Sequence, residues 1–427
     1  MKYTPEEVMQ YVKEEDVKFV RMAFCDVYGR HKNVAIQAGE LARAFSRGIA
    51  IDASAIDGFG ADTDLLLHPD PSTLVQLPWR PQHGRVAHMF CDITHTDGAP
   101  FEADTRRILK EAIRSAEKQG YAFDFGSEME FYLLKLDEYG EPTKIPYDRA
   151  GYLDVAPEDK GENIRREICL TLEQMGIQPE RSLHKIGPGQ NEIDFHYADS
   201  LTAADNAVLF YTMVRTIAAQ NGLWADFSPK PFPDEEGSGM HINLSVRSNM
   251  DAVHGDTDAV HGGADTVHGG TDTIRGGTDP LARIIAGLLE LVPEMTLFFN
   301  PSENSYERLG GSRASARIGW SRRSRALILR VPDTDGQRVE LRSPDALCNP
   351  YLAHALVIYA ALYGIEKNLP LPEEAPASLS PDKLAHYRKL PATYQEAVAA
   401  AFDSTFIRQR LPFSVLTAYC RQRGVQK

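Results

Sequence analysis

Alternation of polar and apolar residues predicts four strands, each with one polar face. In the stretch Phe125-Gly126-Ser127-Glu128-Met129-Glu130-Phe131, alternate side chains of a strand point the same way, so Glu128 and Glu130 share a face. The same alternation recurs in residues 190–196, 239–245 and 338–342. These three segments carry further acids or a histidine on their polar faces.

Helical patterns fill the stretches between these strands. Near the start, Thr4 and Pro5 fit the cap and first position of a helix, and a short strand follows at residues 17–22. Further helices are predicted at residues 105–119, 163–175, 203–221, 280–292 and 350–367. This order of elements predicts an α+β fold whose antiparallel sheet is lined by acids. A chain of 427 residues exceeds the usual size of a single core, so we expect a small domain at residues 1–97 and a larger one at 98–427.

Composition and charge narrow the setting in which the protein works. The net charge of -14 disfavours nucleic acid as a partner. Five cysteines, an odd number without motif spacing, argue against a disulfide framework and for a reducing compartment. No apolar run is long enough to span a membrane, and no apolar core of a signal peptide follows the N-terminus. A cytoplasmic protein without a membrane partner is therefore predicted.

Residues 251–279 depart from globular composition. The pattern Asp-x-x-His-Gly, and later Asp-x-x-Arg-Gly-Gly, repeats every seven residues. Paired glycines exclude a coiled coil. The histidines offer one interpretation, metal binding, but a surface loop of low complexity is the interpretation that we favour, with no catalytic role.

Carboxylates that face one another away from water require a cation. Glutamates together with one imidazole suit Mg²⁺ or Mn²⁺, whereas a structural zinc would favour thiolates, and no Cys-x-x-Cys pair exists in the chain. A single strand of this kind would fit equally well on a half-exposed sheet with its polar side in water. Four such strands favour a hard-cation site.

Arginines are frequent near the last of these strands, and forked guanidiniums suit phosphate and carboxylate substrates. The alternative is a solvated basic face that pairs with nearby acids. The residues are Arg308, Arg322, Arg323, Arg325, Arg330, Arg338 and Arg342.

Several segments together resemble the glutamine synthetase family, type I. They include Phe125-Gly126-Ser127-Glu128-Met129-Glu130, Gly189-Gln190-Asn191-Glu192 and Gly237-Ser238-Gly239-Met240-His241. Residues 48–54, 77–80, 229–231, 304–309, 340–345 and 349–352 continue the likeness in the family's order, so it covers nearly the whole chain. The resemblance implies a β-grasp-like first domain, and a catalytic domain built on a curved antiparallel sheet flanked by helices.

The resemblance also implies a role for individual residues. One divalent ion would lie between Glu128, His241 and Glu340, and a second on Glu130, Glu192 and a third glutamate. Arg325 and Asp52 would take part in catalysis, Asp52 by binding ammonium in the site of a neighbouring subunit. Glutamate would be bound by Gly237, Arg308, Arg325 and Arg342, and ATP by Glu180, Phe195, Tyr197, Ser245, Arg330 and Arg338.

Two positions depart from the family pattern. Lys185 stands where the third glutamate of the second metal site is expected. An ammonium roughly 4 Å from a divalent ion would be repelled by about 8 kcal/mol at an effective dielectric constant of about 20, so the two cannot share that place. Three outcomes remain open: Lys185 replaces the ion by pairing with Glu130 and Glu192, it turns to solvent, or His184 becomes a ligand.

The second departure is in the flap, at residues 310–315. The family commonly has a glutamate there that helps to deprotonate ammonium, whereas this chain has no acid and Arg313 lies nearest the missing side chain. A guanidinium cannot act as a base at neutral pH.

The activity implied by the resemblance is an ATP-dependent ligation with Mg²⁺ or Mn²⁺. It forms L-glutamine from L-glutamate and ammonia through γ-glutamyl phosphate, in a homo-oligomer expected to be a dodecamer. Because of the altered flap, a γ-glutamyl ligase for another amine is an alternative. Because of Lys185 and Arg313 together, so is a catalytically impaired homologue with a binding or regulatory role.

Overall fold

The computed structural model describes residues 3–60, 64–80, 83–248, 280–311, 313–333 and 338–421. The repeat at 251–279 lies outside the described residues. Among those described, no helix is both long and apolar enough to cross a membrane.

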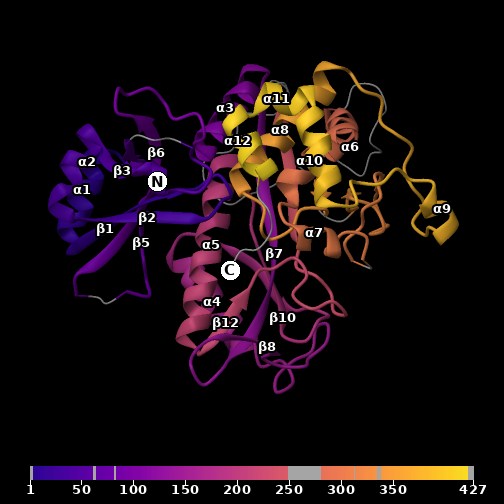
Figure 1. The fold of residues 1–427 in the computed structure, drawn as a ribbon. Coiled ribbons are helices and arrows are strands. Elements are labelled where there is room, and N and C mark those ends of the chain that lie inside the picture. The colour runs from indigo at the N-terminus through magenta and orange to yellow at the C-terminus, as the bar shows by residue number, and fades with distance from the viewer. Residues whose placement is uncertain are drawn as a thin grey trace, which may run out of the picture.

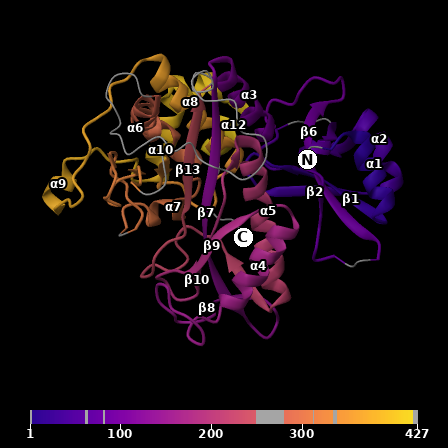
Figure 2. The ribbon, with the colours of Figure 1, turned by 180° about the vertical axis from the view of Figure 1, so that it is seen from behind.

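The N-terminal part of the chain is a mixed sheet with two helices, and it lies beside the rest of the molecule in both views (Figures 1 and 2). Its strand order is β2-β1-β6-β4-β3, with β5 also on β6, and among its described residues only β1 and β6 run parallel. As predicted, Thr4 caps the first helix, and Pro5 begins it. The elements are α1 (Pro5–Glu14), β1 (Val17–Cys25), β2 (His31–Gln37), α2 (Leu41–Arg47), β3 (Ile49–Asp52), β4 (Asp64–Pro69), β5 (Val75–Gln76) and β6 (Arg85–His95).

The remainder of the chain forms a second, larger sheet covered by helices (Figure 1). Its elements up to the repeat are α3 (Thr105–Lys118), β7 (Tyr121–Leu136), β8 (Pro142–Pro146), α4 (Glu162–Gln174), β9 (Pro179–His184), β10 (Gln190–Phe195), β11 (Ala198–Asp199), α5 (Ser200–Gln220), β12 (Leu223–Asp226) and β13 (Met240–Ser248). After the repeat come α6 (Pro280–Phe299), α7 (Glu303–Arg308), β14 (Trp320–Ser321), β15 (Leu329–Arg330), β16 (Val339–Leu341), α8 (Pro350–Glu366), α9 (Pro381–Ala385), α10 (Tyr394–Asp403), α11 (Thr405–Arg410) and α12 (Phe413–Arg421).

Strand β7 organises the larger sheet because it pairs with β13 on one side and β10 on the other. Its odd-numbered residues face the helices: Phe125 stacks on His354 of α8 with ring centroids 4.1 Å apart, and Phe131 packs against Phe210 of α5. Alternation therefore turns Glu128 and Glu130 to the opposite face. The apolar side of the strand fixes where its acids point.

The predicted α+β fold is confirmed, and all four predicted strands exist as β7, β10, β13 and β16. The sheet is antiparallel as expected except for the parallel pair of β14 and β15. The predicted end of α6 at Val292, before Pro293, is wrong, because the helix continues to Phe299. The last turns bury Leu297, Phe298 and Phe299. This burial offsets the hydrogen bond that a proline removes from a helix.

Arg106 at the start of α3 ties the two parts of the chain together. Its buried guanidinium donates at 3.0 Å to both carboxylate oxygens of Asp205 on α5 and at 2.9 Å to Asp70, which follows β4. It also bonds to Asp92 of β6, whose side chain is 45% exposed, and an exposed ion pair contributes little. The bond to Asp70, whose side chain is 17% exposed, is therefore the main link between the two parts, and the bidentate bond to Asp205 holds the guanidinium in place on α5.

Replacement of Arg106 by methionine should destabilise the protein by roughly 3–5 kcal/mol, because Asp205 would keep a buried charge without its partner. The measurement is the midpoint of thermal unfolding. Arg107→Ala is the matched control, since Arg107 forms only a partly exposed pair with Glu111, and it should change stability by no more than about 0.5 kcal/mol. Equal midpoints for both variants would contradict the assigned role of Arg106.

Candidate active site

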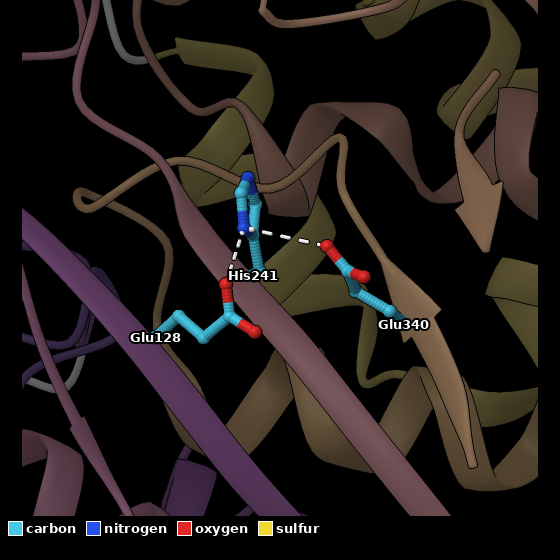
Figure 3. A group of neighbouring side chains, drawn as sticks. All are labelled: Glu128, His241 and Glu340. Carbon is cyan, nitrogen blue, oxygen red and sulfur yellow. Dashed lines mark hydrogen bonds and ion pairs between the residues drawn. The ribbon is translucent and has the colours of Figure 1, made fainter. Parts of the chain in front are cut away.

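Three strands bring two glutamates and a histidine together on the polar face of the sheet (Figure 3). Glu128 of β7 and His241 of β13 are directly opposite in the ladder, and Glu340 of β16 is opposite Asn243, two residues further along β13. His241 Nδ1 lies 2.9 Å from Glu128 Oε2 and 3.6 Å from Glu340 Oε1. All three side chains are buried.

Neighbouring donors hold these acids in their charged form. Asn243 Nδ2 donates to Glu128 Oε1 at 3.1 Å. Burial raises the pKa of Glu128, but the bonds from His241 and Asn243 outweigh it and hold that pKa below its usual range. Glu340 accepts bonds from Arg342 and, at 2.9 Å, from Arg330. Carboxylates that stay ionised inside a protein are suited to bind a cation.

The donor set fits a divalent ion. One ligand atom from each of Glu128, His241 and Glu340 can be chosen so that all three lie within 4.8 Å of one another. Two carboxylate oxygens and one imidazole nitrogen suit Mg²⁺ or Mn²⁺ better than a structural zinc. The fold therefore brings the three predicted ligands of the first metal site together.

The second predicted set is occupied by a side chain of the protein itself. Glu130 and Glu192 are opposite each other on β7 and β10, so the fold brings together the two glutamates that the family resemblance assigns to the second metal site. Lys185 lies between them, with Nζ 2.8 Å from Glu130 Oε1 and 2.6 Å from Glu192 Oε2. Burial raises the pKa of Glu130, but the Lys185 ammonium and other groups lower it to about 2.

The other two outcomes considered for this position do not occur in the structure. Lys185 does not turn to solvent, since its side chain is only 19% exposed and paired twice. His184 does not face the acids: its Nε2 lies 2.9 Å from Asp148, and its Nδ1 lies 2.7 Å from the Lys185 carbonyl oxygen. His184, Asp148 and Asp159 form a separate buried group, in which Arg165 forms an ion pair with Asp159.

A cavity of about 530 Å³ opens over this polar face. All the predicted metal ligands line it, together with Lys185. The predicted glutamate-binding residues line it too: Gly237, Arg308, Arg325 and Arg342. The flap borders it through Gly311, Arg313 and Ala314, while Ser312 lies outside the described residues.

The arginines of the cavity differ in whether they already donate hydrogen bonds to the protein itself. Arg308 is buried and donates to the carbonyl oxygens of Ser343, at 2.9 Å, and Arg342, at 3.4 Å. Gly237 lets it lie so close, because a Cβ there would come within 2.8 Å of Arg308 Cγ. Burial, then the charges of Arg330 and Arg342, lower the pKa of Arg325. A cluster of like charges in a cavity favours an anionic ligand.

The predicted nucleotide-binding residues are only partly gathered. A small cavity of about 40 Å³ is lined by Glu180, Phe195, Tyr197 and Arg338, and it shares Glu128, Arg181 and Arg338 with the larger one. Arg330 lines the larger cavity. Ser245 lies further along β13, opposite Asp124, and lines neither. Asp52 is exposed at the end of β3, where it accepts bonds from Ser54, and it too lines neither cavity.

Two site residues were not predicted from the sequence. Asp194 is buried within reach of Glu128 and Glu192, and burial together with Glu128 raises its pKa to about 7. Arg181 on β9 forms an ion pair with Asp194 and reaches within 3.8 Å of Glu128. Alternation from Glu192 could have placed Asp194 on the same face, whereas no sequence pattern pointed to Arg181.

Family models match both parts of the chain. Residues 16–96 match the glutamine synthetase β-grasp domain, and residues 102–425 match the glutamine synthetase catalytic domain. This chain belongs to the glutamine synthetase family. The predicted family is thus confirmed, and so is the β-grasp fold of the N-terminal part.

Curated relatives and solved structures agree with this assignment. The chain is 41% identical to glutamine synthetase of Methanosarcina mazei over 97% of its length and 92% of that protein. It is 42% identical to glutamine synthetase of Clostridium saccharobutylicum, over 88% of this chain and 83% of that protein. Among solved structures, a complex of GmaS with ADP is 27% identical, with a TM-score of 0.81, over 96% of this chain and 93% of that one.

Glu128→Gln should abolish the first metal site, because it removes a charged ligand while keeping the shape of the side chain. Loss of an outer partner alone weakens metal binding by roughly 10- to 100-fold, so loss of a ligand should cost about 100-fold or more. The measurement is Mn²⁺ binding by electron paramagnetic resonance without nucleotide. Asp124→Asn, on the same strand but paired with Arg247, is the control and should bind Mn²⁺ normally. Unchanged binding in Glu128→Gln would refute the site.

Proposed function

We propose that this chain is an ATP-dependent glutamate–ammonia ligase that forms L-glutamine through γ-glutamyl phosphate. One observation carries the proposal: ligands for a divalent ion and the arginines Arg308, Arg325 and Arg342 line one cavity on the polar face of the sheet. The curated relatives, named glutamine synthetases, confirm the reaction predicted from the sequence.

The chain's own residues supply most of the charge that the reaction requires. When the γ-phosphoryl group of ATP is transferred to the glutamate side chain, negative charge accumulates on the phosphoryl oxygens. Positioned guanidiniums and a divalent ion stabilise this charge. Arg325 and Arg342 are placed to bind these oxygens. Glu128, His241 and Glu340 would hold the ion, which we infer to be Mg²⁺ or Mn²⁺ from their hard donor atoms. An amine then attacks the acyl carbon and phosphate leaves.

Asp52 would bind the ammonium only across a boundary between subunits, since it lies outside the cavity of its own chain. This location supports a homo-oligomer, and we propose the dodecamer implied by the family resemblance. Two domains, 1–97 and 98–427, and a cytoplasmic location complete the proposal. The nucleotide would lie along Glu180, Phe195, Tyr197, Ser245, Arg330 and Arg338.

A second candidate is a γ-glutamyl ligase for an organic amine. The flap presents Arg313 to the cavity and no carboxylate among its described residues. Tyr152, Leu153 and Ile186 also line the cavity, and these apolar side chains are 57%, 58% and 36% exposed. An apolar rim favours the carbon chain of an amine over free ammonium.

Release of ADP with glutamate and ammonium, compared with a panel of primary amines, tests the proposed function. A glutamate ligase should release ADP only when glutamate and an acceptor are both present, with ammonium as the best acceptor. Strong preference for an organic amine would favour the second candidate. Absence of glutamate-dependent ADP release would instead indicate the impaired homologue.

Arg313→Glu should improve the use of ammonium, because it restores an acid to the flap. A positioned base contributes about 100-fold or more in favourable cases, so a gain of roughly 10-fold in kcat/KM for ammonium is expected. Arg323→Glu makes the same charge change on a side chain that is 74% exposed and outside the cavity, and should have no effect. An equal response of the two variants would sink the assignment.

A further inference from the structure

We propose that the Lys185 ammonium is the permanent second cation of this active site, in the place where a second divalent ion would otherwise bind. The inference deepens the proposed function, but the ion count that it fixes can be measured without turnover. The inference concerns position 185, where this chain departs from the family pattern.

The carboxylates around Lys185 leave little room for another cation. Glu130 uses both oxygens, because Oε1 pairs with Lys185 and Oε2 accepts a 2.6 Å bond from the Gly239 amide. Glu192 Oε2 is also engaged by Lys185. A magnesium ion would need ligand oxygens at about 2.1 Å. It would have to displace the Lys185 ammonium from these oxygens and still remain close to its positive charge.

The main chain around Lys185 directs its side chain into the site. Its amide donates to the Gln190 carbonyl at 2.8 Å, and its own carbonyl oxygen lies 2.7 Å from His184 Nδ1. His184 is in turn fixed by Asp148, whose Oδ1 also accepts from the Gly189 amide at 2.9 Å. The turn between β9 and β10 is therefore held at both ends. With its base fixed, the lysine stem reaches Glu130 and Glu192.

Charge supports the same conclusion. A lysine in place of a glutamate raises the charge of position 185 by two, which is the charge of the ion that would be lost. Two carboxylates and one ammonium carry one net negative charge, as do three carboxylates around a divalent ion. The formal charge of these groups is therefore preserved although the chemistry changes.

An ammonium acts through hydrogen bonds, whereas a metal ion acts as a Lewis acid. Two of the three N–H groups of Lys185 serve Glu130 and Glu192. The third is available to an anionic oxygen in the cavity, which Lys185 lines together with Arg325 and Arg342. Lys185 is thereby a candidate binding group for the reacting carboxylate or for the phosphoryl group.

The test is the number of Mn²⁺ ions on the sheet of the full-length protein without nucleotide, read by electron paramagnetic resonance. The native protein should show one ion, which is lost in Glu128→Gln. Lys185→Glu should show two. Because Glu128 and Glu130 are about 7 Å apart along one strand face, the two ions would be coupled in their spectrum. That coupling separates them from any ion held by the histidines of residues 251–279.

Lys144→Glu is the matched control. It makes the same charge change beside a buried acid, Asp226, but outside the cavity, and should keep one ion. A coupled pair of ions in the native protein would overturn the proposal, as would no ion at the Glu128 site or a single ion in Lys185→Glu. If that variant fails to fold, the native spectrum still decides between one ion and a pair. Loss of ligase activity with one ion present would contradict only the proposed function.

Discussion

The structure depends on how buried negative charge is neutralised on one face of β7. Five buried acids converge there: Glu128, Glu130, Glu192, Asp194 and Glu340. Burial, with the carboxylates of Asp194, Glu130 and Glu128, raises the pKa of Glu192 well above its usual range despite Lys185. Carboxylates packed this closely favour a cation among them, so electrostatics supports an added divalent ion independently of the family resemblance.

The cationic side chains of the protein reach these acids from two sides of the site. Arg181 and Lys185 reach the acids from the β9 side, while Arg330 and Arg342 reach Glu340 from the other edge. Between the two groups lies the cavity in which substrate would bind. The site thus has candidate ligands for a metal ion on the sheet and guanidiniums around them, an arrangement suited to phosphoryl transfer.

The sequence predicted the parts of the site that depend on local patterns and missed parts that depend on contacts between distant segments. Alternation is local, so the residue pattern alone was enough to place Glu128, Glu130 and Glu192 on the correct face. Arg181 was missed because its contact with Asp194 depends on the pairing of β9 with β10. The end of α6 was also wrong, because tertiary burial beyond Pro293 outweighed the local effect of a proline.

The ion pairs of Lys185 with its two glutamates affect how strongly the charge of the site depends on the metal content of the solution. A metal ion exchanges with solvent, and its occupancy follows the free concentration and any chelator present. A side chain tethered by its own backbone has no such equilibrium. Scarcity of a divalent ion would therefore empty a site at Glu128 but would leave the Lys185 ammonium beside Glu130, so one positive charge belongs to the polypeptide and only the other would come from the medium.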